Sequence, residues 1–151
     1  MKKKLKKSNM GIVGLRETLQ RKAILQYLSN VNEHPTVKEI HSALKKDIPN
    51  LSVATVYQNL KILTKYCIIK EINIKNMPSR YDANIENHYH IICQSCGNIK
   101  DFNYPVFTEI ENVAGHLFNY EVYSHSLEIY GVCEKCQSDK AYWSKYEYKY
   151  Y

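Results

Sequence analysis

One ten-residue stretch decides the fold of the second half of the chain: HYHIICQSCG, residues 88–97. It contains Cys93 and Cys96, and a second Cys-x-x-Cys pair follows at Cys133 and Cys136. A two-residue gap lets one tight turn aim both sulfurs at a single ion, so the four thiolates predict a closed, tetrahedral structural Zn²⁺ site. Because 36 residues separate the two pairs, the ion would join distant stretches and contribute to folding.

Two alternatives to zinc remain open for these cysteines. The pairs could form two disulfides, or one pair could be a thiol redox centre. A single Cys-x-x-Cys would normally suffice for redox chemistry in a reducing cytosol, which favours zinc. Cys67 belongs to neither pair, and we expect it to be a buried small hydrophobic residue.

The beginning of the same stretch suggests a second metal site. His88 and His90 are two residues apart on an expected strand, so both imidazoles point to one face. Asp82 and Asp101 are near them in the sequence, and His34 joins this set if the fold brings it close. Nitrogen and oxygen donors of this kind suit Fe²⁺, Mn²⁺ or Zn²⁺. The alternative is that these are ordinary surface or core histidines.

Charge divides the 151-residue chain into two halves, although its formal net charge is only +6. Residues 1–83 carry 16 Lys and Arg against 6 Asp and Glu, whereas residues 84–151 carry 5 against 9. A basic half suits a polyphosphate partner such as DNA. No apolar run reaches the roughly 18 residues of a membrane span, and no secretory segment follows the Lys-rich start. We therefore expect a cytoplasmic protein without a membrane partner.

The basic half has the pattern of a winged helix-turn-helix. Apolar residues recur at helical spacing within 15–28, 37–48 and 53–63, and Thr36 and Ser52 are expected to cap the second and third helices. Alternating residues on both sides of the turn at 76–79 predict a hairpin. A third helix of this kind enters the DNA major groove. The alternative is a small three-helix core with an incidental hairpin.

The third helix is expected to bury Val53, Val56, Leu60 and Leu63. The polar residues of its outer face and of the wing are the predicted DNA contacts: Thr55, Tyr57, Gln58, Asn59, Lys61 and Arg80.

The second half predicts an α+β domain of a size that commonly pairs with itself. Its expected elements are strands at 89–93 and 99–102, a helix at 107–118 and a strand at 120–132. The predicted organisation is a DNA-binding domain at 1–83 with a basic arm at 1–14, a metal-binding dimerisation domain at 84–137, and an unassigned aromatic-rich tail at 138–151.

Several motifs together resemble the ferric uptake regulator family, and within it most the peroxide-sensing branch. They are HPTVKEI (34–40), PNLSVATVYQNLKIL (49–63), SRYD (79–82), HYHIICQSCG (88–97), DFNYP (101–105) and LEIYGVCEKC (127–136). The resemblance extends in order over about residues 15–137. It implies a metal-dependent homodimeric repressor that binds a double-stranded DNA operator and is not an enzyme.

The resemblance also implies roles for individual residues. The family's structural zinc ligands fall on Cys93, Cys96, Cys133 and Cys136, and its regulatory Fe²⁺ or Mn²⁺ ligands fall on His34, Asp82, His88, His90 and Asp101. Asp at position 101 resembles the peroxide sensors, in which iron-catalysed oxidation strikes ligand histidines, here His34 and His88. An iron- or zinc-sensing repressor without peroxide chemistry is the alternative, and a thiol-based redox protein is a more distant one.

Two positions depart from the family pattern. Leu19 replaces a proline at the entry to the first helix, so we expect that helix to continue backward into the N-terminal arm. Tyr89 stands where some relatives carry an acidic ligand of an additional metal site. We therefore expect that site to be absent or incomplete, and His125, which matches another of its ligands, to be structural.

Overall fold

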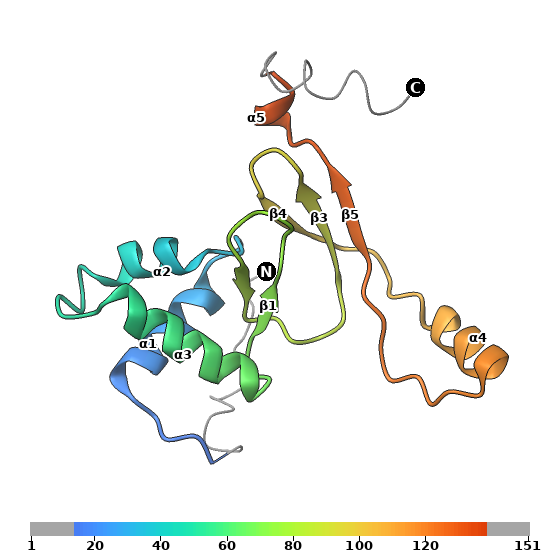
Figure 1. Ribbon diagram of the computed structural model, residues 1–151, viewed down its shortest axis with the longest axis horizontal. Coiled ribbons are helices and arrows are strands. Elements are labelled where there is room, and N and C mark those ends of the chain that lie inside the picture. Colours follow the sequence, from blue (N-terminus) through green and yellow to red (C-terminus); the bar gives the residue numbers. More distant parts are fainter. Residues whose placement is uncertain (1–13, 139–151) are drawn as a thin grey trace. The chain divides into compact units, whose positions relative to one another are not determined.

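The computed structural model describes residues 14–138, and the chain divides into two compact units after Ile85 (Figure 1). The predicted basic arm, apart from Gly14, and residues 139–151 of the predicted tail lie outside the described range.

The first unit contains three helices, α1 (Leu19–Asn30), α2 (Val37–Leu44) and α3 (Val53–Lys65). The predicted caps of α2 and α3 are confirmed. Thr36 and Glu39 form a reciprocal capping box, and the hydroxyl of Ser52 accepts a hydrogen bond from the backbone N–H of Thr55. Each cap satisfies backbone donors that have no partner within the helix itself, so these side chains determine where the two helices begin.

The expected backward extension of α1 is wrong. Thr18 has an extended backbone (φ −127°, ψ 155°), and its hydroxyl accepts a hydrogen bond from the Arg21 N–H at 3.2 Å. Thr18 is therefore the N-cap, and Leu19 is the first helical residue, with 68% of its surface exposed. Leu15 lies outside the helix and packs, partly buried, against the core.

A two-stranded hairpin follows the helices, as predicted. Strand β1 (Lys70–Ile72) pairs antiparallel with β2 (Arg80–Asp82), and Glu71 lies opposite Tyr81. Helices α2 and α3 together with this hairpin have the arrangement of a winged helix-turn-helix.

Cys67 is not the buried residue that the sequence suggested. It is exposed and adopts a left-handed backbone conformation, with φ at 53°. Its N–H donates to Thr64 O at 2.9 Å, and the Ile68 N–H donates to Leu63 O at 3.0 Å. These two bonds form a Schellman motif, which ends α3 and turns the chain into the hairpin.

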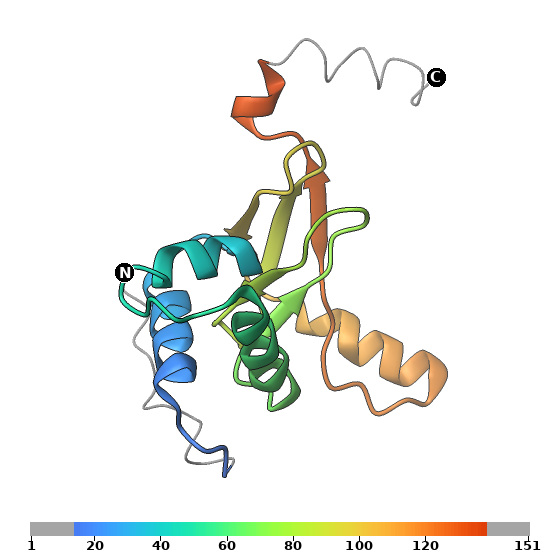
Figure 2. The same ribbon diagram turned by 60° about the vertical axis from the view of Figure 1, so that its left-hand side comes forward.

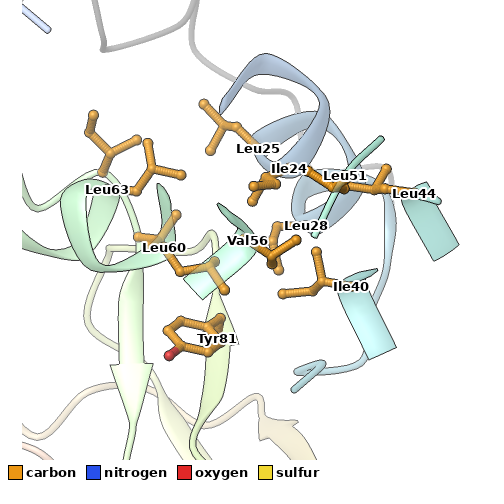
Figure 3. Packing of buried hydrophobic residues seen from close by; sticks show 12 residues of the cluster. Ile24, Leu25, Leu28, Ile40, Leu44, Leu51, Val56, Leu60, Leu63 and Tyr81 are labelled. Carbon is orange, nitrogen blue, oxygen red and sulfur yellow. The ribbon is translucent and has the colours of Figure 1, made fainter. Parts of the chain in front are cut away.

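The core of the first unit is formed by apolar side chains from all three helices and from the hairpin (Figure 3). Burying each aliphatic side chain contributes about 1.5–3 kcal/mol. Two predictions for α3 are wrong: Val53 is 43% exposed, whereas Asn59 is buried. The cluster consists of Ile24, Leu25, Leu28, Ile40, Leu44, Leu51, Val56, Leu60, Leu63, Ile68, Ile69 and Tyr81.

The second unit is built on a three-stranded sheet with the order β4-β3-β5 (Figure 2). Strand β3 (Tyr89–Cys93) pairs antiparallel with β4 (Ile99–Phe102) and parallel with β5 (Glu128–Gly131). The parallel pair requires a long crossover, which contains α4 (Thr108–Phe118); a short helix, α5 (Glu134–Gln137), follows the sheet. The predicted order of strands and helix and the α+β class are confirmed.

The last strand is shorter than the sequence suggested. Only Glu128–Gly131 pairs with β3, and the residues from Tyr120 to Leu127 form no strand. Tyr120 and Tyr123 are 74% and 79% exposed. The alternating pattern of this segment therefore does not correspond to a sheet face.

Candidate metal centres

Four cysteines of the second unit lie together. Cys93 ends β3, Cys96 follows in the turn, and the other two flank the start of α5; their four sulfurs lie within 4.8 Å of one another. Cys96 Sγ and Cys133 Sγ are 3.7 Å apart. Neighbouring sulfurs of a tetrahedral Zn²⁺ site with bonds of about 2.3 Å lie about 3.8 Å apart, whereas a disulfide bond measures about 2.05 Å. The geometry fits zinc and not disulfides.

The local environment gives two of these thiols different pKa values. Burial alone would raise the pKa of the Cys93 thiol, but backbone N–H groups outweigh it and lower this pKa to about 6; one donor is the Cys133 N–H, at 3.3 Å. Burial and the neighbouring thiols raise the pKa of Cys96 to about 12. Four crowded thiols do not all ionise unaided, and a divalent cation compensates the negative charge that opposes ionisation.

A second set of donors lies in the same unit, where β3 begins. His90 is opposite Asp101 in the β3–β4 pairing, and its Nε2 lies 3.9 Å from Asp101 Oδ1. His88 Nε2 lies 3.6 Å from the same oxygen. These separations exceed an ordinary hydrogen bond and are typical of ligands that surround one ion with bonds of about 2.1 Å.

The tautomer of His88 suits metal binding. Its Nδ1 lies 2.8 Å from the Glu86 carbonyl oxygen, which only accepts hydrogen bonds, so Nδ1 carries the proton. The lone pair is then on Nε2, the nitrogen that faces Asp101.

His34 and Asp82 form a pair within the first unit. Both side chains are buried, and His34 Nε2 lies 3.5 Å from Asp82 Oδ2. The other carboxylate oxygen of Asp82 accepts a hydrogen bond from the Asn84 N–H at 2.8 Å. This bond leaves Oδ2 directed toward the imidazole.

Sequence reasoning missed a hydrogen-bonded chain that runs through Tyr89. The buried Tyr89 hydroxyl lies 2.8 Å from His125 Nε2 and accepts a bond of the same length from the Phe107 N–H. His125 Nδ1 lies 2.8 Å from Glu111 Oε1. This chain joins β3 to the N-cap and first turn of α4 and to the segment before β5. The sequence feature that could have indicated this chain is the position of Tyr89 between His88 and His90.

The predicted DNA contacts divide into exposed and internal residues. Tyr57, Gln58 and Lys61 are exposed on α3. Thr55 is partly buried, and its hydroxyl lies 2.8 Å from that of Ser52.

Two of these predicted contacts are directed into the protein instead. Asn59 is buried, and its side-chain amide donates to Thr55 O at 2.8 Å. Arg80 donates to His34 O at 2.8 Å and lies 3.4 Å from Glu39 Oε2. The roles of Asn59 and Arg80 as DNA contacts stay predictions.

The winged helix-turn-helix unit, the four-thiol site and the His/Asp donors define a class of metal-binding proteins with a nucleic-acid-binding type of fold. Comparison with known proteins is consistent with this class. The chain belongs to the ferric uptake regulator family, whose profile matches residues 12–130. The family predicted from the sequence motifs is thereby confirmed.

Comparison with individual relatives shows which members of the family the chain is similar to. The peroxide-responsive repressor PerR of Staphylococcus aureus (strain Mu50) is 51% identical over 124 residues, which span 82% of this chain and 84% of that protein. The solved structure of the Campylobacter jejuni peroxide stress regulator has a TM-score of 0.68 at 32% identity, covering 87% of this chain and 96% of that one. The Helicobacter pylori ferric uptake regulator, described as having three functional metal binding sites, has a TM-score of 0.72 at 27% identity, with 87% and 89% coverage.

No helix within residues 14–138 combines the length and apolar character needed to cross a lipid bilayer.

Proposed function

We propose that this protein is a metal-dependent, DNA-binding transcriptional repressor that senses hydrogen peroxide. The observation that carries the proposal is the convergence of three donors: His88 just before β3, His90 on β3, and Asp101 on the neighbouring strand β4. The likeness to peroxide-responsive repressors supports the same function. Because its partner is chromosomal DNA, we place the protein in the cytoplasm.

We further propose that the donors of both units bind one regulatory ion, Fe²⁺ or Mn²⁺. The pair His34 and Asp82 offers too few ligands for a closed site, and the three donors of the second unit leave positions open. Only five residues separate Asp82 from His88 in the chain, so the two sets are closely tethered. A shared ion would make metal occupancy a determinant of how the DNA-binding unit is held.

Bound Fe²⁺ would activate hydrogen peroxide beside the ligand imidazoles: one peroxide oxygen would be transferred to an imidazole carbon, which supplies the two electrons, and the other oxygen would leave as water. His34 and His88 are the side chains that we expect to take up one oxygen atom. An oxidised imidazole is a weaker ligand, so the donor set loses affinity and the repressor leaves its operator. This oxidation occurs once per molecule, and the proposal includes no catalytic turnover.

The DNA-reading surface that we propose is α3. Tyr57, Gln58 and Lys61 are exposed on it, which suits contacts to bases and phosphates in the major groove. The homodimer that we propose would use α4, because no residue of this helix is buried and its apolar Ile110 and Val113 are more than half exposed.

Peptide mass spectrometry tests the proposed chemistry. The zinc-loaded protein is supplied anaerobically with Fe²⁺ or Mn²⁺, exposed briefly to hydrogen peroxide and digested. We expect one added oxygen on His34 or His88 in the iron form only. Asp101→Glu is the matched variant: it keeps the charge, lengthens the carboxylate, and should reduce histidine oxidation while metal-dependent DNA binding persists.

Other outcomes would replace the proposal. Unmodified histidines in a protein whose DNA binding still depends on metal would indicate an iron- or zinc-sensing repressor without peroxide chemistry. Oxidation confined to the four clustered cysteines, with loss of zinc, would indicate a thiol-based redox protein.

A further inference from the structure

Backbone and side-chain contacts attach the segment before α2 to strand β2. Thr36 forms an isolated antiparallel bridge with Arg80, and this bridge includes the bond from the Tyr81 N–H to Pro35 O at 3.1 Å. The Arg80 guanidinium donates to His34 O at 2.8 Å. All of these contacts lie within the first unit, and the last depends on a single side chain.

The same guanidinium also reaches the start of α2. Its Nη1 lies 3.4 Å from Glu39 Oε2, the oxygen that accepts the Thr36 N–H at 2.6 Å in the capping box. The Glu39 side chain is 53% exposed, so this ion pair is weak in water. The Arg80 side chain is only 14% exposed. Its bond to the His34 carbonyl is therefore the stronger contact, because it is shielded and charge-assisted.

These contacts lie next to two of the proposed metal ligands. Arg80 directly precedes Tyr81 and Asp82 on β2, and it holds the backbone of His34, whose imidazole lies 3.5 Å from the Asp82 carboxylate. The carboxylate itself is oriented by the Asn84 N–H. The relative position of the two donors thus depends on how the segment before α2 rests against β2.

We propose that Arg80 is a positioning residue for the regulatory metal: it holds His34 beside Asp82 and couples this pair to the first turn of α2. The inference rests on the proposed function for the role of the metal, and on the geometry for the role of Arg80. Groups that orient metal ligands in this way typically change metal affinity 10- to 100-fold when they are removed.

Electrostatics alone predict the opposite change in Mn²⁺ affinity when Arg80 is replaced. Removing a positive charge near a cation site should strengthen Mn²⁺ binding, because repulsion between like charges is lost. A positioning role predicts weaker binding after the same change. The sign of the effect therefore separates the two explanations.

The test compares Arg80→Ala with the wild type in zinc-loaded protein, using Mn²⁺ as the probe. We expect at least a tenfold weaker Mn²⁺ affinity by calorimetry. With saturating Mn²⁺, binding to a DNA fragment selected from a random pool by the wild-type protein should recover to within about twofold, with an unchanged salt dependence. Lys75→Ala removes the same charge from the exposed turn of the hairpin, and it should leave Mn²⁺ affinity unchanged.

A variant of a proposed DNA contact should show the opposite combination of effects on Mn²⁺ affinity and DNA binding. Lys61→Ala should keep Mn²⁺ affinity, weaken DNA binding at every Mn²⁺ concentration and lower the salt slope by about one. If Arg80→Ala behaves in this way, Arg80 is a phosphate contact and the inference is overturned. Wild-type or tighter Mn²⁺ binding by Arg80→Ala overturns it as well.

A conservative variant covers the case in which Arg80→Ala does not fold. Arg80→Lys keeps the charge but lacks the planar fork, and we expect a smaller loss of Mn²⁺ affinity at an unchanged melting temperature of the metal-free form. Wild-type affinity in this variant counts against the inference. If Mn²⁺ proves to have no effect on DNA binding by the wild type, the proposed function fails, while the Mn²⁺ affinities still decide the role of Arg80.

Discussion

At the scale of single residues, Tyr89 is the centre of a hydrogen-bonded chain that reaches His125 and Glu111. The Tyr89 oxygen accepts the Phe107 N–H, so its own hydrogen is available to His125 Nε2. Nδ1 of that imidazole then carries the other proton and donates it to Glu111. One hydroxyl group thus has two polar partners, accepting from one and donating to the other.

Removing this hydroxyl should be costly. Tyr89→Phe leaves the Phe107 N–H and His125 Nε2 without their partner, and we expect the free energy of unfolding to fall by about 1–3 kcal/mol. Urea denaturation of the zinc-loaded protein measures the change. Tyr123→Phe is the control, because Tyr123 is 79% exposed and its loss should cost less than about 0.5 kcal/mol. Equal effects of the two variants would contradict the assignment.

The pKa values of Cys93 and Cys96 predict the pH dependence of zinc binding. With a pKa of about 6, the Cys93 thiol is largely ionised at neutral pH, whereas the Cys96 thiol, with a pKa of about 12, still holds its proton there. Zinc must displace that proton, so a higher pH favours binding and a lower pH weakens it. Competition with a chelator from pH 6 to 9 should therefore show zinc affinity rising throughout.

Proton release gives a second measure of the same effect. Because Cys93 is already a thiolate at pH 8, fewer than four protons should leave the four cysteines when zinc binds. Calorimetry in buffers with different ionisation enthalpies counts them. Release of four protons would mean that Cys93 is not ionised beforehand.

At the scale of helices and strands, the sequence predicted those elements whose limits depend on local chemistry. Thr36 and Ser52 cap their helices by bonds to residues three positions away, and such signals are visible in the chain itself. The strand expected at 120–132 is too long. An alternating pattern indicates only that one side of a segment could be buried, whereas a strand also needs a neighbouring strand to which its backbone can hydrogen-bond. Strand β3 supplies partners only for Glu128–Gly131.

The candidate sites show the same difference between residues that the local sequence predicts and residues that only the fold brings together. The four cysteines could be grouped from their spacing, since one tight turn brings each pair together. Asn59 could not be placed by its polarity, although it lies three residues from Val56 and beside Leu60 on the buried stripe. The contact between Arg80 and His34 joins residues 46 positions apart, and only the packing of β2 against the segment before α2 creates it.

Leu19 provides a test at this scale. It is the first residue of α1 and follows an extended Thr18, and proline prefers such a position, where its missing N–H costs nothing. We therefore expect Leu19→Pro to leave the free energy of unfolding unchanged or to raise it by up to about 1 kcal/mol.

The same substitution inside the helix supplies the contrast. Lys22→Pro should cost about 3 kcal/mol or more, because the Lys22 N–H donates to Thr18 O at 3.0 Å. Thermal unfolding followed by circular dichroism compares the two variants. A loss for Leu19→Pro as large as that for Lys22→Pro would mean that α1 begins earlier than Leu19.

At the scale of the whole molecule, α4 has an apolar face that nothing in the described chain covers. Ile110, Val113 and Leu117 recur at helical spacing and are 58%, 55% and 71% exposed. Monomeric proteins seldom leave such a face open to water. A second copy of the chain is the occupant that we propose.

Val113→Glu should disrupt that pairing. A buried, unpaired carboxylate opposes association, and we expect the dimer dissociation constant to rise by at least about 30-fold. Sedimentation velocity over a range of concentrations measures it. Asn112→Glu adds the same charge at an adjacent exposed position of α4 and should change it little; equal effects of both variants would place the interface elsewhere.

Strand β3 is only five residues long, yet it carries His90 and ends in Cys93, and His88 immediately precedes it. In the proposed function, strand β3 therefore carries donors for both the regulatory ion and the zinc ion. Its parallel partner β5 leads directly to the second cysteine pair. We expect a fixed order of maturation, in which a newly made chain captures zinc first and can offer a competent regulatory site only afterwards. A cell short of zinc would then make repressor that manganese cannot activate, so zinc supply would limit control of the peroxide defence.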